Sequence, residues 1–471
     1  MDHESTPLVF KTTDPATLSA GKAYPGHGGQ QAADKLARAA EAQRSWRKTE
    51  FDDRARLMHA AAGVLRQRRN EFAALMTSEM GKTVTDGGAE IDKCASACEH
   101  FAEHAARYLA RQNVDLGGPR AFVAFNPLGV VLAVMPWNFP FWQVFRFAAP
   151  ALMAGNVGIL KHASNVPQCA LAIEDVFKRA GFAEGVFQTL IIGTDPVAGI
   201  IADKRVAAVT LTGSEGAGRQ VASTAGRNLK KAVIELGGSD PFIVMPSADV
   251  ESGAKTAVTA RMINNGQSCI AAKRFIVHER VYDEFMRRFV AGVSELRVGD
   301  PMHPKTQVGP LATAQIRDDL EKQVDATVAA GARLHSGGKR IDGAGYFFQP
   351  TVLSDIPEGS PAESQELFGP VASVWKVASI DEAIERANGT SFGLGASAWT
   401  EDAAERARFV RDIEAGLVFI NGMVASEPAL PFGGVKSSGY GRELGAFGIR
   451  EFVNIKSVKL VAPAENQSST E

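Results

Sequence analysis

The feature that most constrains the fold is an alternation of short apolar runs with helical stretches, which begins at Val130. The first runs predict strands near residues 130–135, 157–161, 187–192, 207–211 and 232–236, with helices between them. Strands that alternate with helices form a parallel sheet with helices on both faces. We therefore predict an α/β fold with a Rossmann-like lobe.

A second alternating series follows and predicts a second α/β lobe. Its strands are expected near 242–244, 275–277, 371–375 and 418–420, and its helices near 251–264, 281–296, 313–330 and 381–388. The two lobes are divided near Gly237-Gly238. Residues 31–112 precede both lobes and are mostly helical in pattern, and residues 114–127 are typical of an extended ribbon.

Length and charge narrow the possible partners. A chain of 471 residues is too long for one hydrophobic core. Its formal net charge of −2 argues against nucleic-acid or anionic-membrane partners, which favour a basic surface. Prolines, asparagines and Arg146 interrupt the apolar stretch 130–160, so it is expected in the core and not in a membrane. Residues 1–13 are polar and carry no apolar signal-peptide region.

The cysteines predict a reducing compartment and no metal centre. The chain has four, Cys94, Cys98, Cys169 and Cys269. Cys94 and Cys98 share a helix face, but no second pair of ligands accompanies them, so we expect no metal. The low cysteine count fits a cytoplasmic protein.

Two reactive side chains, Glu235 and Cys269, lie in glycine-containing segments on either side of the lobe divide. A thiol attacks carbonyl carbons well, and a carboxylate can take a proton from the thiol or from water. Partial burial would raise the pKa of Glu235 and make it a better base near neutral pH. Taken alone, Cys269 is more typical of a small buried residue, and Glu235 could equally face water at a strand end.

Three further segments carry polar groups suited to ligands. Asn138 lies in a rigid turn between two prolines, where a side-chain amide could stabilise an oxyanion or satisfy the backbone. Gly213 and Ser214 join a strand to a helix whose N-terminus would attract phosphate, although the fingerprint Gly-x-Gly-x-x-Gly is absent. Lys161 ends a strand, where a cation would suit a ribose or phosphate and where a solvated lysine is equally common.

Arg146 is the lone charge in an aromatic stretch, residues 141–149. A buried cation without a partner is costly, so its guanidinium requires a protein carboxylate or an acidic substrate.

Together these segments resemble the aldehyde dehydrogenase superfamily from about Ala33 to Val461. The resemblance implies that Cys269 forms a thiohemiacetal, that a hydride then passes to a nicotinamide, and that Glu235 activates the water that cleaves the resulting thioester. Asn138 and the Cys269 amide would form the oxyanion hole. The matching segments are Pro136-Trp137-Asn138-Phe139-Pro140, Thr212-Gly213-Ser214, Glu235-Leu236-Gly237-Gly238, Gly266-Gln267-Ser268-Cys269, Glu366-Leu367-Phe368-Gly369-Pro370 and Pro431-Phe432-Gly433-Gly434-Val435-Lys436.

The resemblance also implies domains and an assembly. Residues 1–113 and 127–236 would bind the cofactor, and 237–451 would form the catalytic domain, whose C-terminal part returns toward the cofactor lobe. Residues 114–126 and 452–471 would form an oligomerisation ribbon and a tail, which implies a homodimer or a homotetramer. The implied cofactor contacts are Trp137, Lys161, Ser164, Gly213, Ser214, Leu236, Glu366 and Phe368.

Within the superfamily the chain is most similar to bacterial succinate-semialdehyde dehydrogenases. This similarity implies that Arg146 and Ser426 bind the carboxylate of the aldehyde substrate. Ile263 replaces a second arginine found in many members, so a broader range of aliphatic or aromatic aldehydes is the alternative. A CoA-acylating dehydrogenase is disfavoured by Glu235, and a binding protein without activity by the intact set Cys269, Glu235 and Asn138.

Ser164 governs the predicted cofactor preference. NAD-preferring relatives often carry glutamate at this position, which would repel a 2′-phosphate by about 4 kcal/mol at about 4 Å and an effective dielectric near 20. Serine removes the repulsion and offers a hydroxyl donor. We therefore expect NADP to be preferred and NAD to be accepted.

Overall fold

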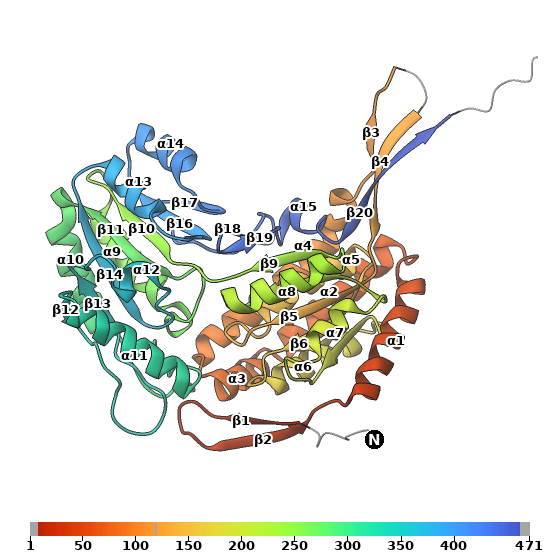
Figure 1. Cartoon of the computed structure of the whole chain (residues 1–471), viewed down its shortest axis with the longest axis horizontal. Helices are drawn as coiled ribbons and strands as arrows, with labels where there is room; N and C mark the ends of the chain where they lie inside the picture. Colours follow the sequence, from red (N-terminus) through yellow and green to blue (C-terminus); the bar gives the residue numbers. More distant parts are fainter. Residues whose placement is uncertain (1–7, 118–119, 462–471) are drawn as a thin grey trace, which may run out of the picture.

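Two α/β lobes lie side by side, and a narrow ribbon of strands projects from one of them (Figure 1). The computed structural model describes residues 8–117 and 120–461. The predicted tail at 462–471 lies outside the described residues, as do residues 1–7 of the polar start.

The first lobe is built on a six-stranded sheet of order β19-β9-β8-β5-β6-β7, parallel except for β19. All six residues of β6 are buried, as expected for a parallel strand covered on both faces. The five strands predicted for this lobe are confirmed, with ends that differ by one or two residues. The strands are β5 (Val130–Met135), β6 (Val157–His162), β7 (Phe187–Leu190), β8 (Val206–Thr212), β9 (Lys231–Glu235) and β19 (Gly439–Tyr440).

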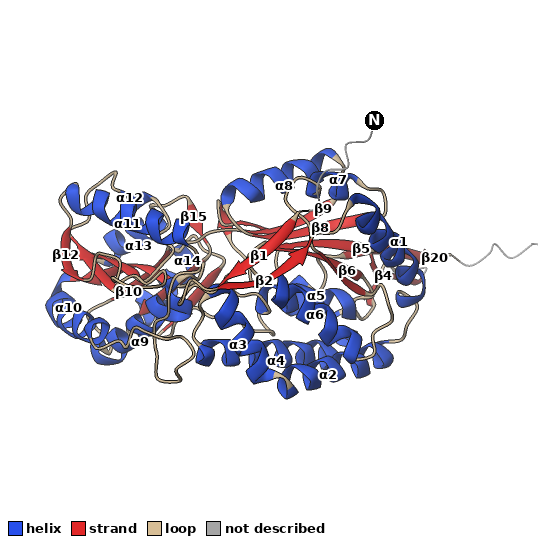
Figure 2. Ribbon diagram, turned by 90° about the horizontal axis from the view of Figure 1, so that it is seen from below, coloured by secondary structure: helices blue, strands red, loops and turns tan. Residues whose placement is uncertain are grey.

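Helices cover both faces of this sheet (Figure 2). The helical pattern predicted over 31–112 is confirmed as α1 to α4, but α4 ends at Tyr108 and Gln112 already begins a strand. The hairpin of β1 (Val9–Thr13) and β2 (Ala20–Pro25) was not predicted. The helices are α1 (Gly29–Trp46), α2 (Phe51–Gln67), α3 (Arg69–Met80), α4 (Val84–Tyr108), α5 (Trp142–Met153), α6 (Pro167–Arg179), α7 (Val197–Ala202) and α8 (Glu215–Arg227).

The second lobe holds a seven-stranded sheet of order β12-β13-β14-β11-β10-β16-β17, in which only the β12–β13 pair is antiparallel. The four predicted strands are confirmed as β10, β11, β14 and β17. The strands of this part are β10 (Asp240–Val244), β11 (Ala272–His278), β12 (Arg333–Ser336), β13 (Thr351–Ser354), β14 (Val371–Val377), β15 (Phe392–Gly393), β16 (Gly395–Trp399), β17 (Leu417–Ile420) and β18 (Val435–Lys436).

The four helices predicted for this lobe are present as α9, α10, α11 and α13. The predicted helix 251–264 is too long: α9 ends at Met262, and Asn264 and Asn265 have left-handed backbone angles that no α-helix contains. The helices of this lobe are α9 (Val250–Met262), the 3₁₀ turn η1 (Ile263–Gly266), α10 (Glu279–Ser294), α11 (Ala314–Ala329), α12 (Pro361–Ser364), α13 (Ile380–Asn388) and α14 (Ala403–Asp412). The short helix α15 (Gly445–Gly448) lies beside the first lobe (Figure 1).

The projecting ribbon consists of β3 (Gln112–Val114), β4 (Arg120–Pro127) and β20 (Val453–Leu460) (Figure 1). β20 pairs with β4 along its full length, from Val453 opposite Pro127 to Leu460 opposite Arg120. This pairing joins segments far apart in the sequence. None of the helices in the described residues combines the length and apolar character needed to cross a bilayer.

The C-terminal part of the chain returns to the first lobe through β19, which pairs with β9 so that Gly439 faces Glu235. Gly439 has a φ of 116°. A Cβ atom there would collide with the carbonyl oxygen of Ile234. Glycine is therefore required where the returning segment meets the strand that carries Glu235.

Replacing Gly439 with alanine should destabilise the protein and lower its activity. A non-glycine residue in this backbone region costs about 1–3 kcal/mol, and the collision with Ile234 adds to that cost. Thermal unfolding of Gly439→Ala measures the effect. Gly63→Ala is the matched control, because Gly63 lies exposed in α2 with open space around its Cα, where alanine is the better helix former. Equal melting temperatures for Gly439→Ala and the wild type would contradict this assignment.

Candidate active site

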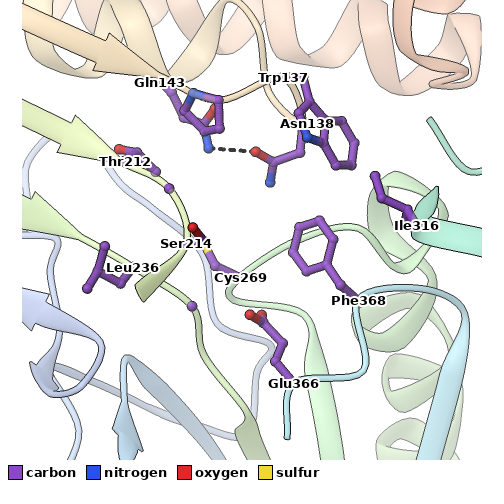
Figure 3. A pocket seen from close by; sticks show the side chains of 13 residues that line it. Trp137, Asn138, Gln143, Thr212, Ser214, Leu236, Cys269, Ile316, Glu366 and Phe368 are labelled. Carbon is purple, nitrogen blue, oxygen red and sulfur yellow. Dashed lines mark hydrogen bonds between the residues drawn. The ribbon is translucent and has the colours of Figure 1, made fainter. Parts of the chain in front are cut away.

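A cavity of about 320 Å³ is lined by residues of both lobes (Figure 3). Its first-lobe residues follow the carboxyl ends of β5, β8 and β9, which is where ligands of open parallel sheets bind. The second lobe supplies the cysteine and one wall. The lining residues are Pro136, Trp137, Asn138, Gln143, Thr212, Gly213, Ser214, Leu236, Gly237, Cys269, Ile316, Glu366 and Phe368.

The loop that carries Cys269 is held by side-chain amides. Asn264, Asn265 and Gly266 all have positive φ, which turns the chain sharply after α9. Asn265 Nδ2 donates to the carbonyl oxygens of Gly81 and Pro310, at 2.9 and 3.0 Å. Asparagine tolerates left-handed backbone angles better than most residues. Asn265 therefore both forms part of the turn and anchors it through its side-chain amide.

Lys273 fixes the backbone on both sides of the thiol. Its Nζ donates to the carbonyl oxygens of Ser268 and Cys269, at 2.8 and 2.9 Å, and pairs with Glu366 Oε1 at 3.2 Å. Lys273 is buried, so these interactions act in a low-dielectric environment. The hydrogen bond from Lys273 thereby fixes the Cys269 carbonyl group and restricts rotation of its peptide unit.

Cys269 is the one cysteine of the four that is not fully buried, since Cys94, Cys98 and Cys169 lie in the core. Burial of its sulfur raises the pKa of the Cys269 thiol to about 12, whereas the positive charges of Arg146 and Lys273 act in the opposite direction. The ligand-free protein therefore holds a protonated thiol at neutral pH, flanked by two cations that stabilise the thiolate when it forms.

Asn138 faces the cavity beside Cys269, in the turn between β5 and α5 (Figure 3). Gln143 Nε2 donates to Asn138 Oδ1 at 3.0 Å, which leaves the amide nitrogen as the group presented to a ligand. One of its hydrogens goes to the carbonyl oxygen of Gln267 at 3.1 Å. The amide thus lies next to the cysteine loop with one N–H available, the arrangement that stabilises a negative oxygen.

Glu235 ends β9 and is buried, but it does not line the cavity. Its Oε1 lies against Gly433, which does not line the cavity either. Burial, together with the negative charge of Glu443, raises the pKa of Glu235 well above its usual value. The water-facing alternative is wrong, because the carboxyl group is buried.

Arg146 has a protein partner. Its Nε is ion-paired with Glu443, and its Nη2 donates to Thr212 Oγ1 at 3.2 Å. Its guanidinium also lies 4.3 Å from the ring centroid of Phe432. Of the two partners considered from sequence, the structure contains the carboxylate, and contact with a substrate remains a prediction. Thr212 lines the cavity, whereas Arg146 does not.

Ser426 is buried in the loop between β17 and β18 and also lies outside the cavity. Its Oγ accepts hydrogen bonds from Lys93 Nζ at 2.7 Å and Trp142 Nε1 at 3.0 Å. Its predicted contact with a substrate carboxylate remains a prediction.

Six of the predicted cofactor residues line the cavity, and two do not. Trp137 and Phe368 form one wall, with ring centroids 5.9 Å apart, and Glu366 accepts from the amide of Gly238 at 3.2 Å. Lys161 lines a second cavity of about 350 Å³, bordered by β8 and α8. Ser164 is exposed three residues beyond Lys161 and belongs to neither cavity. The six that line the first cavity are Trp137, Gly213, Ser214, Leu236, Glu366 and Phe368.

Sequence reasoning missed several residues of the site. Gln143 orients Asn138, Lys273 fixes the cysteine loop, and Glu443 neutralises Arg146. Thr212, Gly237 and Ile316 line the cavity without an earlier prediction of contact. A lysine close after a reactive cysteine was a possible signal for Lys273. The pairing of Glu443 with Arg146 could not be predicted from local sequence, because the two residues lie far apart in the chain.

Comparison with known proteins places these features in a family. The model of the aldehyde dehydrogenase family matches residues 2–458. A succinate-semialdehyde dehydrogenase [NADP(+)] 1 of Mycobacterium ulcerans is 56% identical over 96% of this chain and 99% of that protein.

Solved structures agree with this match. The succinic semialdehyde dehydrogenase of Streptococcus pyogenes, determined in complex with NADP⁺, superposes with a TM-score of 0.94 at 38% identity, over 96% of this chain and 99% of that chain. The succinate-semialdehyde dehydrogenase of Burkholderia pseudomallei gives a TM-score of 0.94 at 34% identity, over 97% of this chain and 95% of that chain.

Replacing Asn138 with alanine should lower kcat for an aldehyde by about 100- to 1,000-fold, the usual cost of one lost oxyanion donor. The rate of Cys269 alkylation by iodoacetamide should stay near the wild-type rate, because the thiol keeps its surroundings. Asn70→Ala, at an exposed position in α3, is the matched control. Steady-state kinetics and alkylation rates measure both effects. An Asn138→Ala variant with wild-type kcat would show that the amide has no part in catalysis.

Proposed function

Because the chain belongs to the aldehyde dehydrogenase family, we propose that it oxidises succinate semialdehyde to succinate, with NADP⁺ as the preferred hydride acceptor and NAD⁺ as a second. The observation that carries this proposal is the presence of Cys269 and the Asn138 amide in one cavity. The proposed substrate and cofactor preference are those in the names of relatives called succinate-semialdehyde dehydrogenase [NADP(+)] 1, which are 55–56% identical to this chain.

The first chemical step forms a bond between Cys269 Sγ and the aldehyde carbon, after the thiol proton has passed to solvent water. The carbonyl oxygen gains negative charge, which the Asn138 amide and the Cys269 backbone N–H stabilise. The cations Arg146 and Lys273 favour the thiolate that attacks. Loss of hydride from the thiohemiacetal leaves a thioester on Cys269.

Hydrolysis of the thioester requires a base. Glu235 takes a proton from water, the water oxygen attacks the acyl carbon, and the acid leaves as the thiol re-forms. In the ligand-free structure the carboxyl group lies against Gly433, and burial raises its pKa. Glu235 does not line the cavity in this structure, so its side chain must turn toward the cavity before it acts as the base.

The first lobe fits a dinucleotide phosphate. Residues 1–113 and 127–236 are the proposed cofactor-binding domain, and NADP⁺, when bound, accepts the hydride. Ser214 caps the N-terminus of α8, and Gly218 allows that helix to approach Leu236 closely. Lys161 is buried at the end of β6, and no carboxylate of the described residues pairs with it. An unpaired buried cation favours an anionic ligand.

A broader aldehyde dehydrogenase is the second candidate, and one observation favours it. Arg146 is neutralised by Glu443, so a substrate carboxylate would have to share this cation. Residues 237–451 contain the cavity wall that an uncharged aldehyde would also contact.

The projecting ribbon supports a homodimer or homotetramer. The outer strands β20 and β3 are edges of their sheet, and Ile455 and Leu460 expose apolar side chains there. Exposed strand edges pair readily with another chain. The four free thiols, three of them buried, support the proposal of a cytoplasmic location.

A panel of aldehydes assayed with both cofactors tests the function. Succinate semialdehyde should give a kcat/KM well above that of butanal, which lacks the carboxylate, and should give it with NADP⁺. Equal values for both aldehydes would favour the broader enzyme, and product formation that depends on CoA would contradict hydrolysis.

Replacing Ser164 with glutamate should lower kcat/KM for NADP⁺ about tenfold or more and change that for NAD⁺ little, because the new carboxylate repels a 2′-phosphate. Exposure of residue 164 allows water to screen this repulsion, so the full Coulomb value is not expected. Ser164→Gln is the matched control, with the same shape and no charge. If Gln and Glu have the same effect, charge at residue 164 does not determine the preference.

A further inference from the structure

Lys93 lies outside the cavity, and its positive charge has no role in the proposed mechanism. Lys93 lies on α4, which packs along α5 (Figure 1). Its Nζ donates to Ser426 Oγ at 2.7 Å and lies 4.4 Å from the ring centroid of Trp142. Lys93 is half-buried, and within the ranges 8–117 and 120–461 no carboxylate lies at ion-pair distance from it.

Ser426 joins Lys93 to the helix that carries Arg146. Its Oγ accepts from Lys93 and from Trp142 Nε1, so both lone pairs are used. The hydroxyl proton remains free to donate, and the described part of the chain offers it no acceptor. Lys93, Ser426 and Trp142 form what we call the Lys93 cluster. It presents donors alone, which suits an anion.

A second cation lies near the Lys93 cluster. Arg146 follows Trp142 by one helical turn and so shares its face of α5. Burial lowers the pKa of Lys93 to about 8, and the positive charge of Arg146 contributes to this. Two cations in a partly desolvated place repel each other, and an anion bound there relieves the repulsion. The positive charge of Arg146 also lowers the pKa of the Cys269 thiol, so one guanidinium acts electrostatically on both the Lys93 cluster and the thiol.

We propose that Lys93 binds the carboxylate of the semialdehyde together with Ser426, and thereby determines the preference for an aldehyde that carries an acid group. This inference rests on the proposed function. Arg146 forms an ion pair with Glu443, whereas Lys93 forms no ion pair with any of the described residues. The ammonium therefore supplies the free positive charge of the site, and Arg146 supports it.

The test compares three variants of Lys93 in the intact enzyme. Lys93→Gln keeps a hydrogen-bond donor to Ser426 but removes the charge, Lys93→Met removes both, and Lys93→Arg keeps the charge. For succinate semialdehyde, KM should rise about tenfold or more in the Gln and Met variants, because a charged hydrogen bond is lost. KM for butanal and kcat for both aldehydes should change less than about twofold. The Arg variant should retain most of the selectivity.

Lys322→Gln is the control for the loss of a lysine charge, since its side chain is 76% exposed on α11. A purely structural role would raise KM for both aldehydes alike and lower thermal stability in the Met variant. That outcome, or unchanged selectivity in Lys93→Gln, would overturn the inference. If the wild type shows no preference for succinate semialdehyde over butanal, the proposed function is contradicted. The inference about Lys93 is then overturned too, because it rests on that function.

The dependence on pH gives a second readout. Lys93 is charged below its pKa, so KM for succinate semialdehyde should be low near pH 7 and rise as the pH passes about 8. In Lys93→Arg this rise should vanish, because guanidinium does not titrate there. The groups that face Lys93 are Arg146 on α5, Glu427 in the loop after β17, and Cys94 and Glu90 on α4. A rise that persists in Lys93→Arg would assign the titration to one of these.

Discussion

The arrangement of the active site depends on one buried carboxylate, that of Glu90 on α4, which contacts the N-terminus of α5. Glu90 Oε1 accepts from the backbone amides of Phe141 and Trp142, at 2.9 and 2.8 Å, and Lys82 neutralises its other oxygen. A carboxylate at a helix N-terminus satisfies amides that have no partner in the helix and interacts favourably with the helix dipole. The turn with Asn138 precedes these amides directly, and Trp142 and Arg146 follow on the helix. One carboxylate on α4 therefore sets the position of the oxyanion donor and of the substrate side of the site.

The same construction holds the cysteine loop. A buried cation, Lys273, replaces the carboxylate, and backbone carbonyls replace the amides. In both places a buried charge is acceptable because it is paired and hydrogen-bonded, and removing either partner would leave the other uncompensated. The proposed catalytic groups differ from these two charges. Burial raises the pKa of the Cys269 thiol and of the Glu235 carboxyl group, which favours the neutral form of each in the ligand-free protein.

Much of the architecture could be predicted from the sequence, because strand and helix patterns depend on local residue order. The nine predicted strands are present, but β12, β13 and β16 of the second sheet were not predicted. The prediction failed where a local pattern was interrupted by backbone geometry: the helix predicted to reach Asn264 ends at Met262, since two asparagines there adopt left-handed angles. The site was less accessible to prediction. The ion pair of Arg146 with Glu443 and the hydrogen bond of Lys93 with Ser426 join residues from distant segments, and only folding brings them together.

The central claim is that Cys269 carries the acyl group and that Glu235 releases it. The most direct measurement is a single-turnover experiment with Glu235→Gln, in which NADPH formation and the mass of the protein are followed after mixing with NADP⁺ and succinate semialdehyde. The account predicts a burst of one NADPH per active subunit, then arrest, with one succinyl group attached to the peptide that contains Cys269. Continued turnover at the wild-type rate, or an acyl group on Cys94, Cys98 or Cys169, would contradict it.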